Sequence, residues 1–278
     1  MLGGLGFTSD VELLVIGLLA GCLGGMLGIG GGLVMIPAMI IFLGDQRFGT
    51  SSLHLYKLAA ITTGVVVSVP AAMRHARAKA VIYAMLPAIL PAAIIGVVAG
   101  VYVAGRFFGD DHTHLLRRLF GAFLELAVAV NVFQDWYAGH GDTGLSAASP
   151  LPSRRALIGG VVGIPTGLIA GLLGIGGGIW NVPAQHLLFS VRLRYAIATS
   201  SFVVVFVSAI TAVIQAVSVS RMPGMRVADG WWLALWLSPG AMVGGWWGAA
   251  LTHRLPTRWL RWAFQGLLCL AGLRLMLG

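Results

Sequence analysis

Two runs of three glycines are the residues of this chain best suited to bind a ligand through the backbone. The runs are Gly30, Gly31 and Gly32 in the first half of the chain, and Gly176, Gly177 and Gly178 in the second. Glycine destabilises a helix interior, so we expect a helix to break at each run. A helix that restarts there presents free backbone N–H groups and a partial positive charge. Two such helix ends would form a binding site for a small anion.

Each glycine run belongs to a segment that occurs twice. The sequence "GMLGIGGGLVMIPA" (residues 25–38) and the sequence "GLLGIGGGIWNVPA" (residues 171–184) share nine of fourteen residues at an offset of 146. Glycine-interrupted segments at matching places in two repeats are the best sequence pointer to the binding site of a transporter.

The similarity between the two halves extends beyond the glycine runs. The sequence "LPAAIIGVVAG" (90–100) aligns with "SPGAMVGGWWG" (238–248), proline with proline and glycine with glycine. The chain is therefore expected to contain two transmembrane repeats of four segments each, at 1–136 and 156–278. A polar stretch at 137–155 contains Gly, Ser and Pro and is expected to be the linker loop.

Polar side chains inside the apolar segments are the next candidates. Asn181 follows the second glycine run, and its counterpart in the first half is Met35, so the predicted site is asymmetric. Hydroxyl groups occur in both halves, at Thr62, Thr63, Thr199 and Ser200. Such hydroxyls either bond to the backbone of their own helix or bind an oxyanion, and the sequence leaves both roles open.

Two ionisable residues also lie in apolar segments. Lys57 is expected to extend its ammonium group to the membrane surface, to bind an anion, or to pair with Glu125. Glu125 lies near the centre of its segment, and we interpret it as a candidate for ion coupling, either as a proton carrier or as the partner of a base. The alternative for Glu125 is a satisfied ion pair or a protonated carboxyl group.

The composition predicts an all-α integral membrane protein. Of 278 residues, 58% are hydrophobic and 10% are charged, and the mean hydropathy is +0.90. A soluble domain carries roughly 25% charged residues. The net charge of +9 comes from short loops between apolar runs, which is typical of anchoring at lipid headgroups and not of a nucleic-acid surface.

The apolar segments number about eight, and the first of each half is the longest. The expected segments are 11–43, 53–73, 80–105, 115–136, 156–190, 196–219, 230–252 and 259–277. In both halves GIGGG divides the first segment, and the piece that follows spans only about 17 Å as a helix. Because the hydrocarbon core is about 30 Å thick, we expect a broken helix or a re-entrant hairpin. New helices should begin near Leu33 and Ile179.

A re-entrant first segment gives each half an odd number of crossings, so the two repeats would have inverted topologies. The Lys and Arg residues in the loops then divide as 10 on one side and 7 on the other, which favours this arrangement. Glycines four residues apart elsewhere, such as Gly240, Gly244 and Gly248, predict close helix packing instead of ligand binding.

These features together resemble the TauE/SafE family of bacterial membrane permeases, the sulfite exporter family. The resemblance rests on "GCLGGMLGIGGGLVMIPA" (21–38), on "GLIAGLLGIGGGIWNVPA" (167–184), and on the Thr-Ser-rich "AIATSSFVVVFVSAITA" (196–212). It implies transport of a sulfur oxyanion or organosulfonate such as sulfite, and it leaves other small anions open as substrates. "LYKLAAITTGVVVSVP" (55–70) departs from the family pattern by its lysine.

The favoured hypothesis is a secondary carrier for a small anion in the inner (plasma) membrane of a bacterium. Its partners would be the anion and the lipid bilayer, without nucleic acid, metal or cofactor, and homo-oligomerisation is left open. The alternative is an anion channel or a non-transporting membrane assembly subunit whose glycines serve packing alone. An enzyme is disfavoured, because the sequence lacks HExxH, GxSxG and P-loop motifs.

Overall fold

The fold was obtained as a computed structural model, which describes residues 7–27, 30–43, 52–107, 113–138, 155–222, 224–251 and 258–277. Within these ranges the chain is almost entirely helical and contains no β-strand. The stretches long and apolar enough to cross a membrane are Leu53–Arg77, Tyr83–Arg106, Ala156–Leu173 and Leu193–Ser220. The chain is therefore an all-α membrane protein, as its composition predicts.

The first half forms a series of helices that ends before the long polar stretch. The elements are α1 (Phe7–Leu27), α2 (Gly32–Phe42), α3 (Ser52–Arg77), the 3-10 turn η2 (Tyr83–Met85), α4 (Leu86–Phe107) and α5 (Thr113–Ala138). Residues 139–154, which make up most of the predicted linker 137–155, lie outside the described residues.

The second half contains a comparable series. The elements are α6 (Arg155–Ile158), η5 (Gly159–Gly163), α7 (Ile164–Leu173), α8 (Gly178–Pro183), η6 (Ala184–Leu188), α9 (Leu193–Ser220), α10 (Val227–Leu251) and α11 (Arg258–Leu277). Both η5 and η6 are π-helical and flank the second glycine run. Such π-helical turns are rare and often lie at functional sites.

Helices are interrupted at both glycine runs. Helix α2 begins at Gly32 and helix α8 begins at Gly178, each one residue before the expected starts at Leu33 and Ile179. Helix α2 has 11 residues, which corresponds to about 17 Å and is too short to cross the hydrocarbon core alone. The backbone break therefore lies within the bundle.

Glycines join α1 to α10, and α7 to α4, with backbone against backbone. A Cβ atom added at Gly21 would lie 2.8 Å from the Cα atom of Ala241, and one added at Gly171 would lie 2.9 Å from the nitrogen of Val101. Small residues at this spacing let membrane helices approach closely. The α1–α10 seam contains Gly17, Gly21, Gly25, Gly240, Gly244 and Gly248, so the packing role predicted for the last three agrees with their contacts.

We call the α1–α10 contact and the contact of α4 with η5 and α7 the two glycine seams. In each seam the residue numbers of the contacting partners increase in the same direction, which shows that the helices are parallel. The contacting pairs are Gly17 with Leu237 and Gly25 with Gly245 in one seam, and Gly159 with Ala88 and Gly171 with Val101 in the other. Helix α3 is also parallel to α10, with Leu58 beside Gly230 and Val67 beside Gly245.

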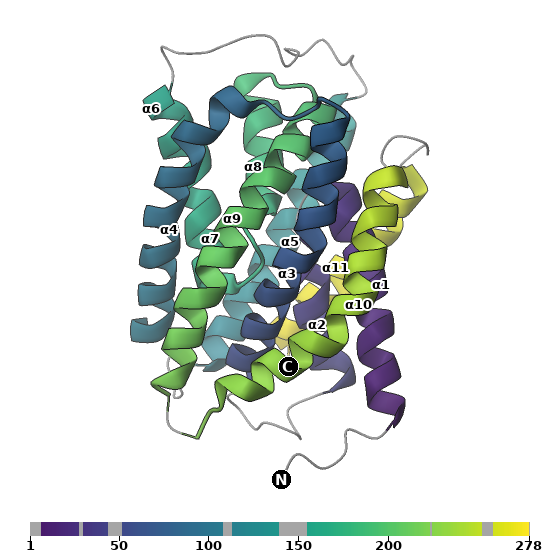
Figure 1. The fold of residues 1–278 in the computed structure, drawn as a ribbon, viewed down its shortest axis with the longest axis vertical. Helices are drawn as coiled ribbons and strands as arrows, with labels where there is room; N and C mark the ends of the chain where they lie inside the picture. Colours follow the sequence, from purple (N-terminus) through teal and green to yellow (C-terminus); the bar gives the residue numbers. More distant parts are fainter. Residues whose placement is uncertain are drawn as a thin grey trace.

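These contacts fix the relative directions of α1 and α7. Helices α1 and α3 both run parallel to α10, whereas α4 turns back from α3 and runs parallel to α7. Helix α1 therefore runs opposite to α7. Figure 1 shows the same relation: the α3–α4 connection lies at the upper end of the bundle, and the α9–α10 connection lies at the lower end.

Two apolar cores enclose the breaks. One core joins residues of α1, α2, α3, α5, α10 and α11 with Leu173, Ile175 and Ile179 around the second break. The other joins α4, α7 and α9 with residues of η5, α8 and η6. Because α2 contributes Leu33 and Met35 at 1% and 0% exposure, the polar backbone of the first break is removed from the surface of the bundle.

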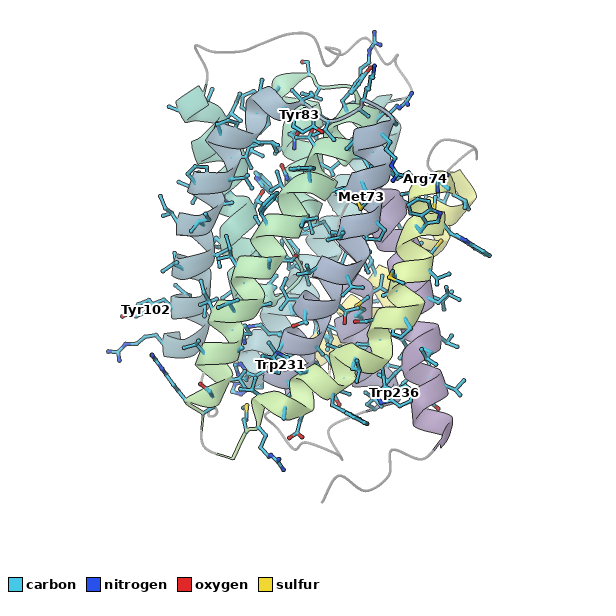
Figure 2. The ribbon with its side chains drawn as sticks, in the orientation of Figure 1. Met73, Arg74, Tyr83, Tyr102, Trp231 and Trp236 are labelled. Atoms are coloured by element: carbon cyan, nitrogen blue, oxygen red, sulfur yellow. The ribbon has the colours of Figure 1, made fainter. Side chains whose placement is uncertain are left out.

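Aromatic side chains on the outer surface lie toward both ends of the bundle. Tyr83 is near the upper end in Figure 2, and Trp231 and Tyr102 are in its lower part. All three are more than half exposed. Near the upper end the Arg74 guanidinium lies 4.8 Å from the ring centre of Trp246. Aromatic and basic residues in these places are typical of the two membrane–water interfaces.

Candidate functional site

The glycine runs adopt a backbone that other residues rarely adopt. Gly30 and Gly31 have φ values of 79° and 76°, and Gly176 and Gly177 have values of 76° and 71°. These angles lie in the left-handed region, where glycine has no steric penalty. Gly174, at φ 74°, ends α7 with its N–H donating to the carbonyl of Ala170 at 2.8 Å. The glycines therefore let one helix stop and another start within a few residues.

A new helix begins directly after each break. The carbonyl of Gly31 accepts hydrogen bonds from the N–H groups of Val34 and Met35 at 3.0 and 3.1 Å. The carbonyl of Gly177 accepts hydrogen bonds from the N–H groups of Trp180 and Asn181 at 3.2 and 3.3 Å. The N–H groups of the residues between, at 32–33 and 178–179, precede the first bonds of their helices. These are the groups that an anion at a helix start would contact.

The two breaks touch each other and Lys57. A Cβ atom added at Gly32 would lie 3.1 Å from the Cα atom of Ile175 and 3.2 Å from the carbonyl oxygen of Gly174. A Cβ atom added at Gly174 would lie 3.0 Å from the Cβ atom of Lys57. We call Gly32, Lys57, Gly174 and Ile175 the break junction. It brings together residues from both halves of the chain.

Lys57 is buried at the break junction. Its exposed fraction is 1%, and its Nζ atom has no hydrogen-bond partner. The side chain therefore neither extends to the membrane surface nor hydrogen-bonds to Glu125, which were two of the three roles considered from the sequence. A buried ammonium group is costly unless it is paired and hydrogen-bonded. Of the three roles, the burial of Lys57 is compatible with anion binding.

Hydroxyl groups border the first break on the other side. A Cβ atom added at Gly30 would lie 3.4 Å from Oγ of Ser68, and one at Gly64 would lie 3.3 Å from the carbonyl oxygen of Gly30 and 3.7 Å from Oγ of Ser208. The hydroxyl of Ser208 is buried without a hydrogen-bond partner, and so is that of Thr63, the residue before Gly64 in the sequence. These groups are available to donate to a ligand oxygen.

Gly64 also contacts the first break, but it was not predicted from the sequence as a site residue. It lies seven residues after Lys57, which places both on one face of α3 about 10 Å apart. One face of α3 therefore contacts both breaks, through Gly64 at the first and Lys57 at the second. The seven-residue spacing of Lys57 and Gly64 is visible in the sequence. The contact of α3 with the two breaks is not, because it depends on how the helices pack.

The second break also has a pair of buried amides. Asn181 and Gln185 are 0% exposed, and Nε2 of Gln185 donates to Oδ1 of Asn181 at 2.7 Å. Nδ2 of Asn181 and Oε1 of Gln185 have no hydrogen-bond partner. The first-half counterparts Met35 and Met39 are apolar and equally buried. The polar lining is thus different at the two breaks.

The remaining predicted hydroxyls have structural partners. Oγ1 of Thr62 donates to the carbonyl of Leu58 in its own helix at 2.7 Å. Oγ1 of Thr199 accepts the N–H of Ile82 at 2.9 Å, and this bond ties α9 to the segment before α4. Ser200 is fully buried. Of the two roles left open for such hydroxyls, Thr62 has the helix-bonding one.

Glu125 lies between α5 and α11, and it is not among the residues of the break junction. A Cβ atom added at Gly272 of α11 would lie 3.2 Å from the carboxyl carbon of Glu125. The Oε1 atom is buried and has no hydrogen-bond partner. The structure therefore brings Lys57 together with the two breaks. Glu125 instead lies at the contact between α5 and α11.

A family model described as Sulfite exporter TauE/SafE matches residues 13–275 of the chain. Among curated proteins, the chain is 29% identical over 297 residues to the probable membrane transporter protein MamO of Paramagnetospirillum magneticum. It is 28% identical to the protein of the same name in Magnetospirillum gryphiswaldense, and 28% identical to the probable membrane transporter protein YunE of Bacillus subtilis.

These alignments differ in how much of each relative they cover. They include 99% of this chain but 46% of either MamO protein, so the chain spans about half the length of those two relatives. The alignment with YunE includes 96% of this chain and 97% of that protein. No solved structure matches the chain significantly.

Proposed function

Because the chain belongs to the sulfite exporter TauE/SafE family, we propose that it is a secondary carrier for a small anion. Its relatives are named probable membrane transporters, which favours transport over enzymatic activity. The proposed substrates are sulfur oxyanions and organosulfonates such as sulfite, and the proposed location is the bacterial inner (plasma) membrane. The bilayer and the anion are the proposed partners.

The observation that carries the proposal is the break junction. The start of α2 meets the end of α7 there, beside a lysine that is 1% exposed and has no hydrogen-bond partner, and α8 starts four residues after Gly174. Backbone N–H groups and an ammonium group are the donors that an oxyanion requires. The proposed site comprises residues 30–32, Lys57, Thr63, residues 176–178 and Asn181. Thr62, Thr199 and Ser200 contribute by shaping its walls.

We further propose that 1–136 and 156–278 are inverted repeats. Three observations support this: α1 runs opposite to α7, the α1–α10 seam has a counterpart in the α7–α4 seam, and each half contains a glycine break. In transporters built this way, the site lies between the repeats, and rocking of one repeat against the other exposes it alternately. The position of the break junction between both halves fits that mechanism.

Glu125 is the proposed coupling residue. Ionisable groups within membrane segments are costly and are usually functional. Its position between α5 and α11, outside the break junction, suits a group that changes protonation without competing for the anion. Coupling to a proton gradient would then provide the driving force for transport.

The proposal is tested by flux in proteoliposomes made from the purified full chain. Vesicles are loaded with sulfite, sulfoacetate, sulfate or chloride, with and without an imposed proton gradient, and protein-free vesicles are the control. Saturable uptake of one sulfur anion, stimulated by the same anion inside, is expected of a carrier. Flux that does not saturate and shows no such stimulation would indicate a channel. If proteoliposomes that contain folded protein show no flux of any of these anions, neither a carrier nor a channel for them is supported.

A further inference from the structure

The charge balance of the break junction restricts which anions it can hold. In the part of the chain that the structure describes, Lys57 is the only Lys, Arg, Asp or Glu among the buried residues. Apart from His54 and His75, the other buried polar side chains among the described residues are hydroxyls and amides, which donate hydrogen bonds without a net charge. An anion next to the ammonium group favours its charged form, so Lys57 supplies one positive charge to a bound anion.

The helix starts provide N–H groups that orient a bound anion, but they contribute little net charge to the site. Helix α1 ends at Leu27, five residues before Gly32, and α7 ends at Leu173, five residues before Gly178. The partial positive charge at each helix start thus lies beside the partial negative charge at the end of the preceding helix. These opposite charges offset each other, whereas the ammonium group of Lys57 has no such neighbour in the junction.

Resting on the proposed function, we infer that the break junction selects singly charged oxyanions over doubly charged ones and that Lys57 sets this preference. A monoanion beside Lys57 forms a buried pair with no net charge. A dianion leaves one unpaired negative charge in the low-dielectric interior, which is strongly unfavourable. A zwitterion brings its own cation and leaves one positive charge in excess.

Lys57 also links the two halves of the chain. It belongs to α3 of the first half, and its Cβ and Cγ atoms lie against Gly174 of the second half. Lys57 therefore lies where the two halves of the chain meet. Because the preference comes from the charge balance of the bound state, it should appear in equilibrium binding and not only in transport rates.

The test uses sulfonates that share one headgroup and differ in charge. Ethanesulfonate has a charge of about −1, ethane-1,2-disulfonate about −2, and 2-aminoethanesulfonate about zero; butane-1-sulfonate controls for length. Affinity is measured from the ligand-induced rise in melting temperature of the purified full chain in detergent. We expect both monoanions to bind at least about tenfold more tightly than the disulfonate or the zwitterion, a gap of about 1.4 kcal/mol.

Variants of Lys57 test the cause of the preference. In Lys57→Met the affinity for ethanesulfonate should fall at least about tenfold, which removes the preference, because a buried charge partner is lost. Lys57→Arg, which retains the charge, should keep the order of affinities. Lys79→Met removes an exposed lysine by the same substitution and should behave like the wild type.

The outcomes separate the inference from the proposed function. Equal or tighter binding of the disulfonate by the wild type overturns the inference and leaves anion transport standing. An unchanged preference in Lys57→Met overturns the role of Lys57. If the folded wild type binds none of the sulfonates and transports no anion, the proposed function fails and the inference fails with it. The wild-type series remains decisive even if Lys57→Met does not fold.

Discussion

Replacing Lys57 by methionine should stabilise the ligand-free protein. Lys57 is 1% exposed, and its Nζ atom has no hydrogen-bond partner, whereas its Cβ and Cγ atoms pack against Gly174. Methionine is also unbranched and keeps this packing, but it removes the buried polar group. The expected change is opposite in sign to that of most core substitutions, which destabilise.

The magnitude follows from the missing partner. A buried polar group left unsatisfied costs about 1–3 kcal/mol, and more if it is charged, so we expect the free energy of unfolding to rise by about 2 kcal/mol. For chains of roughly 150–250 residues, a change of this size moves the melting temperature by about 4–8 °C. Lys79→Met, at an exposed position, should change the stability by less than about 0.5 kcal/mol.

The assay is thermal unfolding of the purified protein in detergent, in a buffer whose main anion is gluconate. Saturating ethanesulfonate should raise the melting temperature of the wild type and leave that of Lys57→Met nearly unchanged. A lower melting temperature for Lys57→Met in the absence of sulfonate would refute the reasoning. It would mean that the lysine contributes to the stability of the empty protein.

Three other substitutions test separate parts of the structure. Gly21→Ala places a methyl group against the backbone of Ala241 and should lower the free energy of unfolding by about 1–3 kcal/mol, measured by thermal unfolding. Thr199→Val removes the acceptor for the Ile82 N–H; the same assay should show a loss of about 1–3 kcal/mol. Glu125→Gln should retain anion exchange in proteoliposomes and lose the response to a proton gradient.

The positions of the breaks were predictable because their cause is local. A left-handed φ favours glycine at the position that adopts it, so three consecutive glycines mark the end of one helix and the start of the next. The observed starts at Gly32 and Gly178 are each one residue from those expected. Apolar run length likewise predicted membrane helices such as α3 and α9.

The contacts of Lys57 were not predictable, because they depend on which helices become neighbours. The sequence offered three roles for this lysine, and only the packing of α3 against Gly174 distinguishes among them. Thr62 and Thr63 illustrate the same limit. Adjacent residues of a helix point about 100° apart, so Thr62 and Thr63 have different surroundings. The Thr62 hydroxyl bonds to its own helix, whereas the Thr63 hydroxyl is buried without a partner.

The π-helical segments were also missed. Five residues in η5 and five in η6 bond one position further along the chain than in an α-helix. Apolar periodicity does not distinguish the two geometries over so short a stretch. Pro183 directly precedes η6 and lacks an N–H group, which was the one local signal of an altered hydrogen-bond pattern there.

The central claim, that the anion binds where the two breaks meet, is tested most directly by sulfite flux into proteoliposomes of Gly32→Ala. The added methyl group would stand 3.1 Å from the Cα atom of Ile175, between the breaks, at a position whose φ is not left-handed. Gly105→Ala is the matched control, since its methyl group would meet nothing within 4 Å. We predict at least about tenfold slower flux for Gly32→Ala, equivalent to about 1.4 kcal/mol, at an unchanged melting temperature, and wild-type flux for the control. Wild-type flux from Gly32→Ala would contradict the claim.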